Sequence, residues 1–191
     1  MAKEHVCPVW VGYLLASPVR KWFQNPKKLL GPYIEEGMTA LDIGCAMGFF
    51  SLPMARMVGP NGKVICVDLQ EEMIAALEKR ARKAGLSERM ETRLCQSNSL
   101  GLNDLKEAID FALASAVVHE VPDAAVFFSE LSAAMKPGGR LLVAEPSGRV
   151  EEEDFGVTIS VAEQHGFKAM DRLQACRSRV ALLEKRSAKP E

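Results

Sequence analysis

Several features that define whole classes of protein are scarce or missing in this sequence of 191 residues. Its five cysteines are scattered, and none forms a C-x-x-C pair. Such a set is typical of reduced thiols in the cytoplasm and not of a disulfide framework. No apolar run is long enough to span a bilayer, and the N-terminus does not have the pattern of a leader peptide. We therefore expect a cytoplasmic protein with no membrane span.

An excess of charge of one sign is also lacking, because the formal net charge is only −1. A nearly neutral chain has no broad electrostatic attraction to nucleic acid, and we expect the one basic cluster, Arg20 to Lys28, to be a solvated face. The three histidines, the cysteines and the carboxylates show no metal-ligand spacing. Nucleic acid is therefore an unlikely partner on this pattern, and no metal site is expected.

Apolar residues are abundant, at 48% of the chain. A chain of this length can bury the core of one domain, and its sequence contains no internal repeat and no sign of a second domain. We expect one domain over 1–191, with a sheet-containing core over 38–185 and a helical cap over 1–37. The oligomeric state is not indicated by any pattern in the sequence.

The segment 1–37 contains both tryptophans and is divided by four prolines. Asn25 and Pro26 have the residue types of an N-cap and a first helical position. Apolar content this dense is not typical of a disordered tail. Two hypotheses stay open: the segment is a helix pair packed over one edge of the sheet without contact to a ligand, or Trp10 to Phe23 closes over a ligand as a lid and forms part of the acceptor pocket. A lid would change tryptophan fluorescence on ligand binding.

The chain is organised around a strand–turn–helix unit. The apolar run Thr39 to Ile43 leads into two glycines, Gly44 and Gly48, and a helical pattern follows. Glycine accepts backbone conformations that other residues resist, and a helix N-terminus presents free N–H groups. In an open α/β sheet, such a turn at the carboxyl end of a strand is where ligands bind. Two glycines alone could also be no more than a helix-starting turn.

A carboxylate favours the ligand hypothesis. Lys63 to Asp68 has the pattern of a buried strand, and Asp68 ends it roughly 20 residues after the glycine turn. A carboxylate in this place typically accepts hydrogen bonds from a pair of ribose hydroxyls. The dinucleotide fingerprint G-x-G-x-x-G is absent, which argues against a nicotinamide-dependent oxidoreductase. The sequence thus predicts a ribose-containing ligand other than NAD.

The glycine turn resembles the first motif of class I S-adenosylmethionine-dependent methyltransferases, in which an acidic residue precedes G-x-G-x-G. Asp42, Gly44 and Gly48 match this motif, and Ala46 stands at the middle glycine. Two later stretches, Asp110 to Val121 and Leu131 to Glu145, resemble the family's motif after the fourth strand and its helix–K-P-G-G–strand motif. The resemblance covers about residues 38–185 and is closest to small-molecule methyltransferases of the quinone-biosynthesis type, known as methyltransferase type 11.

The alternation of strand and helix patterns predicts a mostly parallel sheet with helices on both faces. Strands are expected at 39–43, 63–68, 91–94, 110–115, 140–145, 167–173 and 178–185. Helices are expected at 49–58, 71–84, 122–135 and 153–165, with a turn at Lys136 to Gly139. The short connection between the last two strands predicts an antiparallel hairpin. The resemblance implies a Rossmann-like sheet of seven strands, in the order 3-2-1-4-5-7-6, with strand 7 antiparallel.

The resemblance also implies the residues that bind S-adenosyl-L-methionine. Backbone of the glycine turn would contact the methionine and ribose parts, Asp68 the ribose hydroxyls, and Leu69 the adenine ring. Asp42 would tether the turn or the ammonium group of the cofactor, and Gln96 and Ser97 would lie near the adenine amine. The implied cofactor-binding residues are Asp42, Gly44, Cys45, Ala46, Gly48, Asp68, Leu69, Gln96, Ser97, Ser115 and Ala116.

His119 is the candidate catalytic base, because it follows the tip of the fourth strand and imidazole titrates near neutral pH. The alternative is a histidine that only braces this loop. Glu120 and Glu145 are interpreted as solvated or supporting carboxylates. The leading function is methyl transfer from S-adenosylmethionine to a small-molecule acceptor. The alternatives are a protein that binds this cofactor without turnover, and a methyltransferase that acts on RNA or protein.

Overall fold

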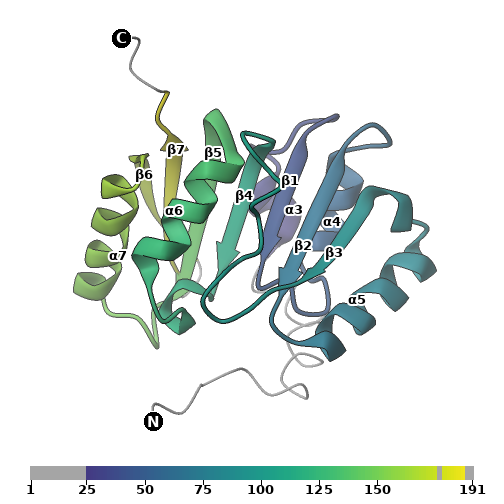
Figure 1. The fold of residues 1–191 in the computed structure, drawn as a ribbon, viewed down its shortest axis with the longest axis horizontal. Helices are drawn as coiled ribbons and strands as arrows, with labels where there is room; N and C mark the ends of the chain where they lie inside the picture. The colour runs from purple at the N-terminus through teal and green to yellow at the C-terminus, as the bar shows by residue number, and fades with distance from the viewer. Residues whose placement is uncertain (1–24, 176–177, 188–191) are drawn as a thin grey trace.

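The computed structural model of the chain describes residues 25–175 and 178–187. In this part, seven strands form one sheet in the order β3-β2-β1-β4-β5-β7-β6 (Figure 1). The strands are β1 (Thr39–Ile43), β2 (Lys63–Asp68), β3 (Met90–Leu94), β4 (Ile109–Ser115), β5 (Met135–Pro146), β6 (Phe167–Ala175) and β7 (Ser178–Lys185). β7 is antiparallel to β5 and to β6, and the remaining pairs are parallel. The predicted order and the antiparallel seventh strand are confirmed.

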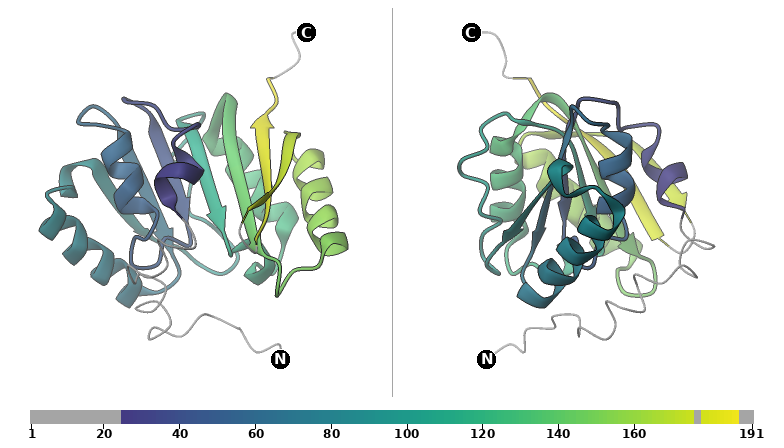
Figure 2. Two further views of the ribbon diagram at one scale, coloured as in Figure 1. Left: turned by 180° about the vertical axis from the view of Figure 1, so that it is seen from behind. Right: turned by 90° about the vertical axis from the view of Figure 1, so that its right-hand side faces the viewer.

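Helices cover both faces of the sheet. They are α3 (Pro26–Leu30), α4 (Ser51–Met57), α5 (Glu71–Ala84), α6 (Ala124–Ala134) and α7 (Glu152–Gln164). One buried cluster joins side chains of α6 and α7 to one face, and a second joins α3, α4 and α5 to the other. The view from behind in Figure 2 brings α3 and α4 in front of the sheet, whereas α6 lies in front of it in Figure 1. A short 3₁₀ turn, Ser87–Arg89, precedes β3.

The two clusters follow from the alternation of side chains along a strand. In β1, Leu41 and Ile43 belong to the cluster under α6 and α7, whereas Ala40 belongs to the cluster under α4. Asp42 therefore lies on the α4 face, where a charged residue is costly unless it is hydrogen-bonded. Its partner is one of the contacts that build the site described below.

Helix ends follow local capping chemistry. The Asn25 side chain accepts hydrogen bonds from the N–H groups of Lys27 and Lys28, which confirms the predicted N-cap of α3. Asp123 caps α6 in the same way. Gly85 ends α5 in the left-handed conformation, at φ 66°. Such local signals explain why the predicted boundaries differ from the observed ones by only a few residues.

The expected turn Lys136–Gly139 lies within the span of β5. The pairing of β5 with β4 has a register shift near its start. Ile109 lies opposite Met135, but Phe111, only two residues later, lies opposite Arg140. Lys136, Pro137 and Gly138 are exposed and bulge from the ladder, and Gly138 has φ 77°. Proline and a glycine with positive φ cannot continue a regular strand, so the predicted turn is present as a bulge at the start of β5.

Only residues 25–37 of the expected N-terminal cap belong to the described part of the chain. In these residues, Leu30 and Ile34 are buried on the α4 face, and the ring of Tyr33 stacks on Phe111 with centroids 6.1 Å apart. This piece packs on a face of the sheet and not along an edge. Trp10 to Phe23, and with them the lid hypothesis, lie outside the described residues. No helix in 25–175 or 178–187 is long and apolar enough to cross a membrane.

Candidate functional site

The glycine turn follows β1 and is held against β2. The N–H groups of Gly44 and Cys45 donate to the carbonyl of Val67 at 2.8 and 3.1 Å. Gly44, Ala46 and Gly48 all have positive φ, at 67°, 45° and 81°. This backbone explains the two glycines, and it places the alanine in a conformation that costs an L-residue free energy.

Gly44 is also required because of a close approach. A Cβ atom on Gly44 would lie 2.3 Å from Cγ2 of Val117, in the loop that follows β4. The two loops are therefore in contact at the carboxyl edge of the sheet. Any side chain at position 44 would displace the loop that carries His119.

Asp68 ends β2 beside the glycine turn. One of its carboxylate oxygens accepts from the N–H of Ala46 at 2.8 Å, and the other accepts from the N–H of Gln70 at 3.0 Å. The side chain is nearly buried, and this burial raises the pKa of Asp68, although the backbone N–H groups oppose the shift. Asp68 is thus a carboxylate kept close to the turn by neutral donors.

Asp42, in β1 just before the turn, ties the strand to the helix that follows the turn. It is 2% exposed, and its Oδ2 accepts from Oγ of Ser51 at 2.5 Å. Ser51 is the first residue of α4, so this bond joins the strand before the turn to the helix after it. Of the two roles expected for Asp42, the tether is the one with an observed contact. Arg80 of α5 adds a further tether by donating to the carbonyl of Met47.

The environment of the Cys45 thiol argues against a reactive thiol. The thiol is buried, and burial raises its pKa well above the ordinary value. A thiol in this state has little thiolate character. The expected part of Cys45 in a cofactor site is therefore that of its backbone.

Exposed apolar side chains flank Asp68. Leu69 is 41% exposed and Leu94, at the end of β3, is 58% exposed. Leu94 pairs with Asp68 in the β2–β3 register, so both leucines lie beside the carboxylate. Sequence reasoning missed Leu94; its signal was an apolar residue at the tip of the strand before Gln96. Gln96 and Ser97 are exposed in a tight turn that follows β3.

The loop after β4 is held by Glu145 of β5. Ala116 has φ 58°, and its N–H donates to the carbonyl of Ala144 at 2.8 Å. Oε1 of Glu145 accepts from the N–H groups of Val117 and Val118 at 3.2 and 2.8 Å. Its Oε2 lies 2.5 Å from Nδ1 of His119. Glu145 is 1% exposed, so its interpretation as a solvated carboxylate is wrong; the supporting role is the correct alternative.

His119 belongs to a short 3₁₀ turn, Val118–Glu120, and its side chain is 19% exposed. Its Nε2 lies 3.7 Å from Oε1 of Glu120, which is 3.9 Å from a guanidinium nitrogen of Arg149. The hydrogen bond to Glu145 raises the pKa of His119; the charge of Glu120 adds to the shift and that of Arg149 opposes it. Burial raises the pKa of Glu120.

The fold thus brings the predicted residues together at the carboxyl ends of the parallel strands.

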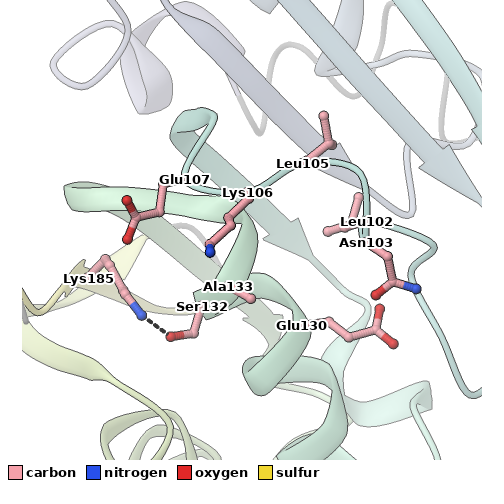
Figure 3. A pocket seen from close by; sticks show the side chains of 9 residues that line it. All are labelled: Leu102, Asn103, Leu105, Lys106, Glu107, Glu130, Ser132, Ala133 and Lys185. Atoms are coloured by element: carbon pink, nitrogen blue, oxygen red, sulfur yellow. Dashed lines mark hydrogen bonds between the residues drawn. The ribbon is translucent and has the colours of Figure 1, made fainter.

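A cavity of about 280 Å³ lies elsewhere, between the 102–107 loop, α6 and Lys185 of β7 (Figure 3). Lys185 ends β7 near the amino end of the regular part of β5, far along the strands from Glu145. No group of three or more His, Cys, Asp and Glu side chains in the described residues could hold a metal ion.

Comparisons with known proteins find methyltransferases. A family model described as a methyltransferase domain matches residues 34–181. The demethylmenaquinone methyltransferase of Bacillus velezensis is 26% identical over 137 residues, which cover 72% of this chain and 55% of that protein. The ubiquinone biosynthesis O-methyltransferase of Bradyrhizobium diazoefficiens is 33% identical over 147 residues, with 75% and 53% covered. The chain spans about half the length of these curated relatives.

A solved structure shares the fold. The crystal structure of a SAM-dependent methyltransferase from Aquifex aeolicus superposes with a TM-score of 0.82 at 24% identity. The match covers 94% of this chain and 98% of that one. At this level of identity, the likeness supports the architecture and carries no statement about the acceptor.

Proposed function

This chain belongs to the S-adenosylmethionine-dependent methyltransferase family, and from that premise we propose that it transfers a methyl group from S-adenosyl-L-methionine to a small-molecule acceptor. The observation that carries the proposal is the buried carboxylate of Asp68 beside a glycine turn with three positive φ values. In a Rossmann-like sheet, a carboxylate beside a glycine turn is suited to bind a ligand that contains a ribose. The proposed site comprises the residues implied by the sequence, with Leu94 added.

The residues present fit this cofactor. Asp68 would accept hydrogen bonds from the ribose hydroxyls beside or in place of those from its backbone N–H donors, and Leu69 and Leu94 offer apolar surface to the adenine ring. The backbone of the glycine turn would contact the methionine part of the cofactor, and so would Ser115 and Ala116 at the end of β4. When bound, S-adenosylmethionine supplies a methyl carbon whose bond to a positively charged sulfur breaks with the electron pair retained by sulfur.

His119 is the proposed catalytic base. A neutral imidazole can accept the proton that an acceptor loses as it gains a methyl group. The hydrogen bond between Nδ1 and Glu145 leaves Nε2 for this proton. The remaining work of the chain is to orient the reactants and exclude water, because the displacement itself needs no group beyond an activated acceptor.

A small-molecule acceptor is supported by the names of two relatives, a demethylmenaquinone methyltransferase and a ubiquinone biosynthesis O-methyltransferase. The near-neutral net charge gives no reason to prefer a nucleic acid. We further propose that the chain acts as one domain in the cytoplasm, in keeping with its scattered cysteines.

Calorimetry with S-adenosylhomocysteine, S-adenosylmethionine and NAD tests the cofactor assignment. We expect both sulfur compounds to bind and NAD not to bind. A turnover screen with methyl-labelled cofactor against pooled metabolites and RNA then tests the reaction. Label in a metabolite supports the proposal. Label in RNA or in the protein itself favours a macromolecular acceptor, and tight binding with no turnover favours a non-catalytic binding protein.

A further inference from the structure

We propose that Glu145 is the positioning residue of this site: it holds His119 in the Nδ1–H tautomer, so that Nε2 is the nitrogen left to accept a proton. The inference rests on the proposed function for its purpose, since a base needs a defined lone pair. The observations behind it do not depend on the cofactor. They are the contacts of one buried carboxylate, Glu145, with the three consecutive residues Val117, Val118 and His119.

The hydrogen bonds of Glu145 leave little freedom to the loop. Oε1 accepts from two successive backbone N–H groups, those of Val117 and Val118, and Oε2 lies 2.5 Å from Nδ1 of His119. A carboxylate is an acceptor only, so the proton in the contact with His119 must be on Nδ1. In the neutral imidazole, Nε2 then carries the lone pair.

Backbone strain indicates that this arrangement is held in place by its neighbours. Ala116, immediately before the loop, has φ 58°, a conformation that an alanine adopts at a cost. Its N–H donates to the carbonyl of Ala144, the residue before Glu145. β5 therefore accepts three backbone hydrogen bonds from the turn out of β4, one at the Ala144 carbonyl and two at the Glu145 side chain.

The same carboxylate links the histidine to the cofactor loop. Val117 donates its N–H to Glu145, and its Cγ2 atom occupies the space that a side chain on Gly44 would need. A shift of Glu145 would thus be transmitted to the glycine turn through Val117. We infer that Glu145 sets the position of His119 relative to the proposed methyl donor as well as its tautomer.

The other charges that face His119 do not replace this role. Glu120 lies 3.7 Å from Nε2, beyond a hydrogen bond, and Arg149 reaches Glu120 at 3.9 Å. Glu120 and Arg149 act on the imidazole by charge in opposite directions. Among the described residues, the contact with Glu145 is the only short hydrogen bond to a ring nitrogen of His119, and it therefore determines which nitrogen carries the proton.

NMR of the full chain, labelled with ¹⁵N at its histidines, tests the inference. The spectrum of a His119→Gln variant identifies the His119 signals. In the wild type, we expect the neutral form to be the Nδ1–H tautomer. In Glu145→Gln, the amide oxygen can still accept from Val117 and Val118, but the amide NH₂ donates to Nδ1. We therefore expect the proton to move to Nε2 and the titration midpoint of His119 to fall.

Glu120→Gln is the matched control, because it also removes one negative charge near the imidazole. It should lower the midpoint by less and leave the tautomer unchanged. An Nε2–H tautomer in the wild type overturns the proposal, and so does a midpoint that is the same in Glu145→Gln as in the wild type. If Glu145→Gln does not fold, the wild-type tautomer still decides. Failure of S-adenosylhomocysteine to bind would instead count against the proposed function and leave the tautomer result intact.

Discussion

Two nearly buried carboxylates occupy corresponding places in the two halves of the sheet. Asp68 ends β2, beside the loop that follows β1, and Glu145 lies in β5, beside the loop that follows β4. Each loop contains an alanine with positive φ, Ala46 in the first and Ala116 in the second. Each carboxylate accepts hydrogen bonds from backbone N–H groups of the loop beside it. The strained turns of both loops are thus stabilised from the neighbouring strand.

The two carboxylates differ in what completes their hydrogen bonding. Glu145 has a charged or chargeable partner in His119, whereas the hydrogen bonds that Asp68 accepts in the described residues come from backbone N–H groups. Burial without such a partner raises the pKa of Asp68. Donors from a ligand would relieve this cost. Glu145 thus supports the protein's own loop, whereas Asp68 is the carboxylate that we propose binds the ligand.

The largest expected effect comes from removing the partner of His119. Glu145→Ala leaves two backbone N–H groups and an imidazole without their acceptor, which should lower the free energy of unfolding by about 3–5 kcal/mol. Urea unfolding monitored by circular dichroism measures it. Glu88→Ala, at an exposed position, is the control and should change stability by no more than about 0.5 kcal/mol. A loss below about 1 kcal/mol would remove the distinction between the two carboxylates.

The next effect separates binding from stability. Asp68→Ala should weaken S-adenosylhomocysteine binding by roughly 10- to 100-fold, because hydrogen bonds to a charged group contribute about 1.5–3 kcal/mol. Calorimetry measures the affinity, and urea unfolding measures the stability of the same variants. Asp68→Asn keeps one acceptor but sets its amide NH₂ against the N–H of Ala46 or Gln70, so it should lower the free energy of unfolding by about 1–3 kcal/mol. Unchanged affinity in Asp68→Ala would refute the ligand role.

A smaller effect depends on pH. His119 has a raised pKa in the folded chain, so its protonated form stabilises the fold. This contribution is complete below the pKa of an unfolded histidine, about 6.5, and is lost as pH rises through the raised pKa of the folded state. The stability difference between the wild type and His119→Gln should therefore shrink with rising pH, by on the order of 1 kcal/mol. Urea unfolding across this range tests it; a difference that grows with pH contradicts it.

The smallest effects concern the two alanines with positive φ. Ala46→Gly and Ala116→Gly relieve roughly 1–2 kcal/mol of left-handed strain but add about 0.4–1 kcal/mol of unfolded-state entropy. Each should be neutral or stabilising by up to about 1.6 kcal/mol. Ala75→Gly, on the exposed side of α5, is the control and should cost about 1 kcal/mol. Ala46→Gly should also keep cofactor affinity; a loss of ~10-fold or more would mean that the Ala46 methyl group makes a needed contact.

Much of the fold was accessible from the sequence because its signals are local. Apolar alternation and runs marked the strands, and the boundaries of β1, β2 and β7 match the expectation. The strand order came from the resemblance of the motifs and not from periodicity. The bulge at Lys136 to Gly139 shows where a local signal was correct but incomplete: proline and glycine predicted a break, and strand pairing on both sides of it made the break part of β5.

The proposed cofactor side of the site also rests on local signals, since Gly44, Gly48 and Asp68 are marked by spacing along one strand–turn–helix–strand unit. For Glu145, the sequence left two alternatives open, a solvated or a supporting carboxylate, and it gave no sign of the partner. Nothing local links it to His119; the β4–β5 register, with Ser115 opposite Ala144, brings them together. A carboxylate becomes a positioning residue only when the neighbouring strand presents donors to it, and that neighbour is chosen by the packing of the sheet. The sequence by itself determined the elements and the glycine turn, and the tertiary structure alone decided which carboxylate holds the histidine.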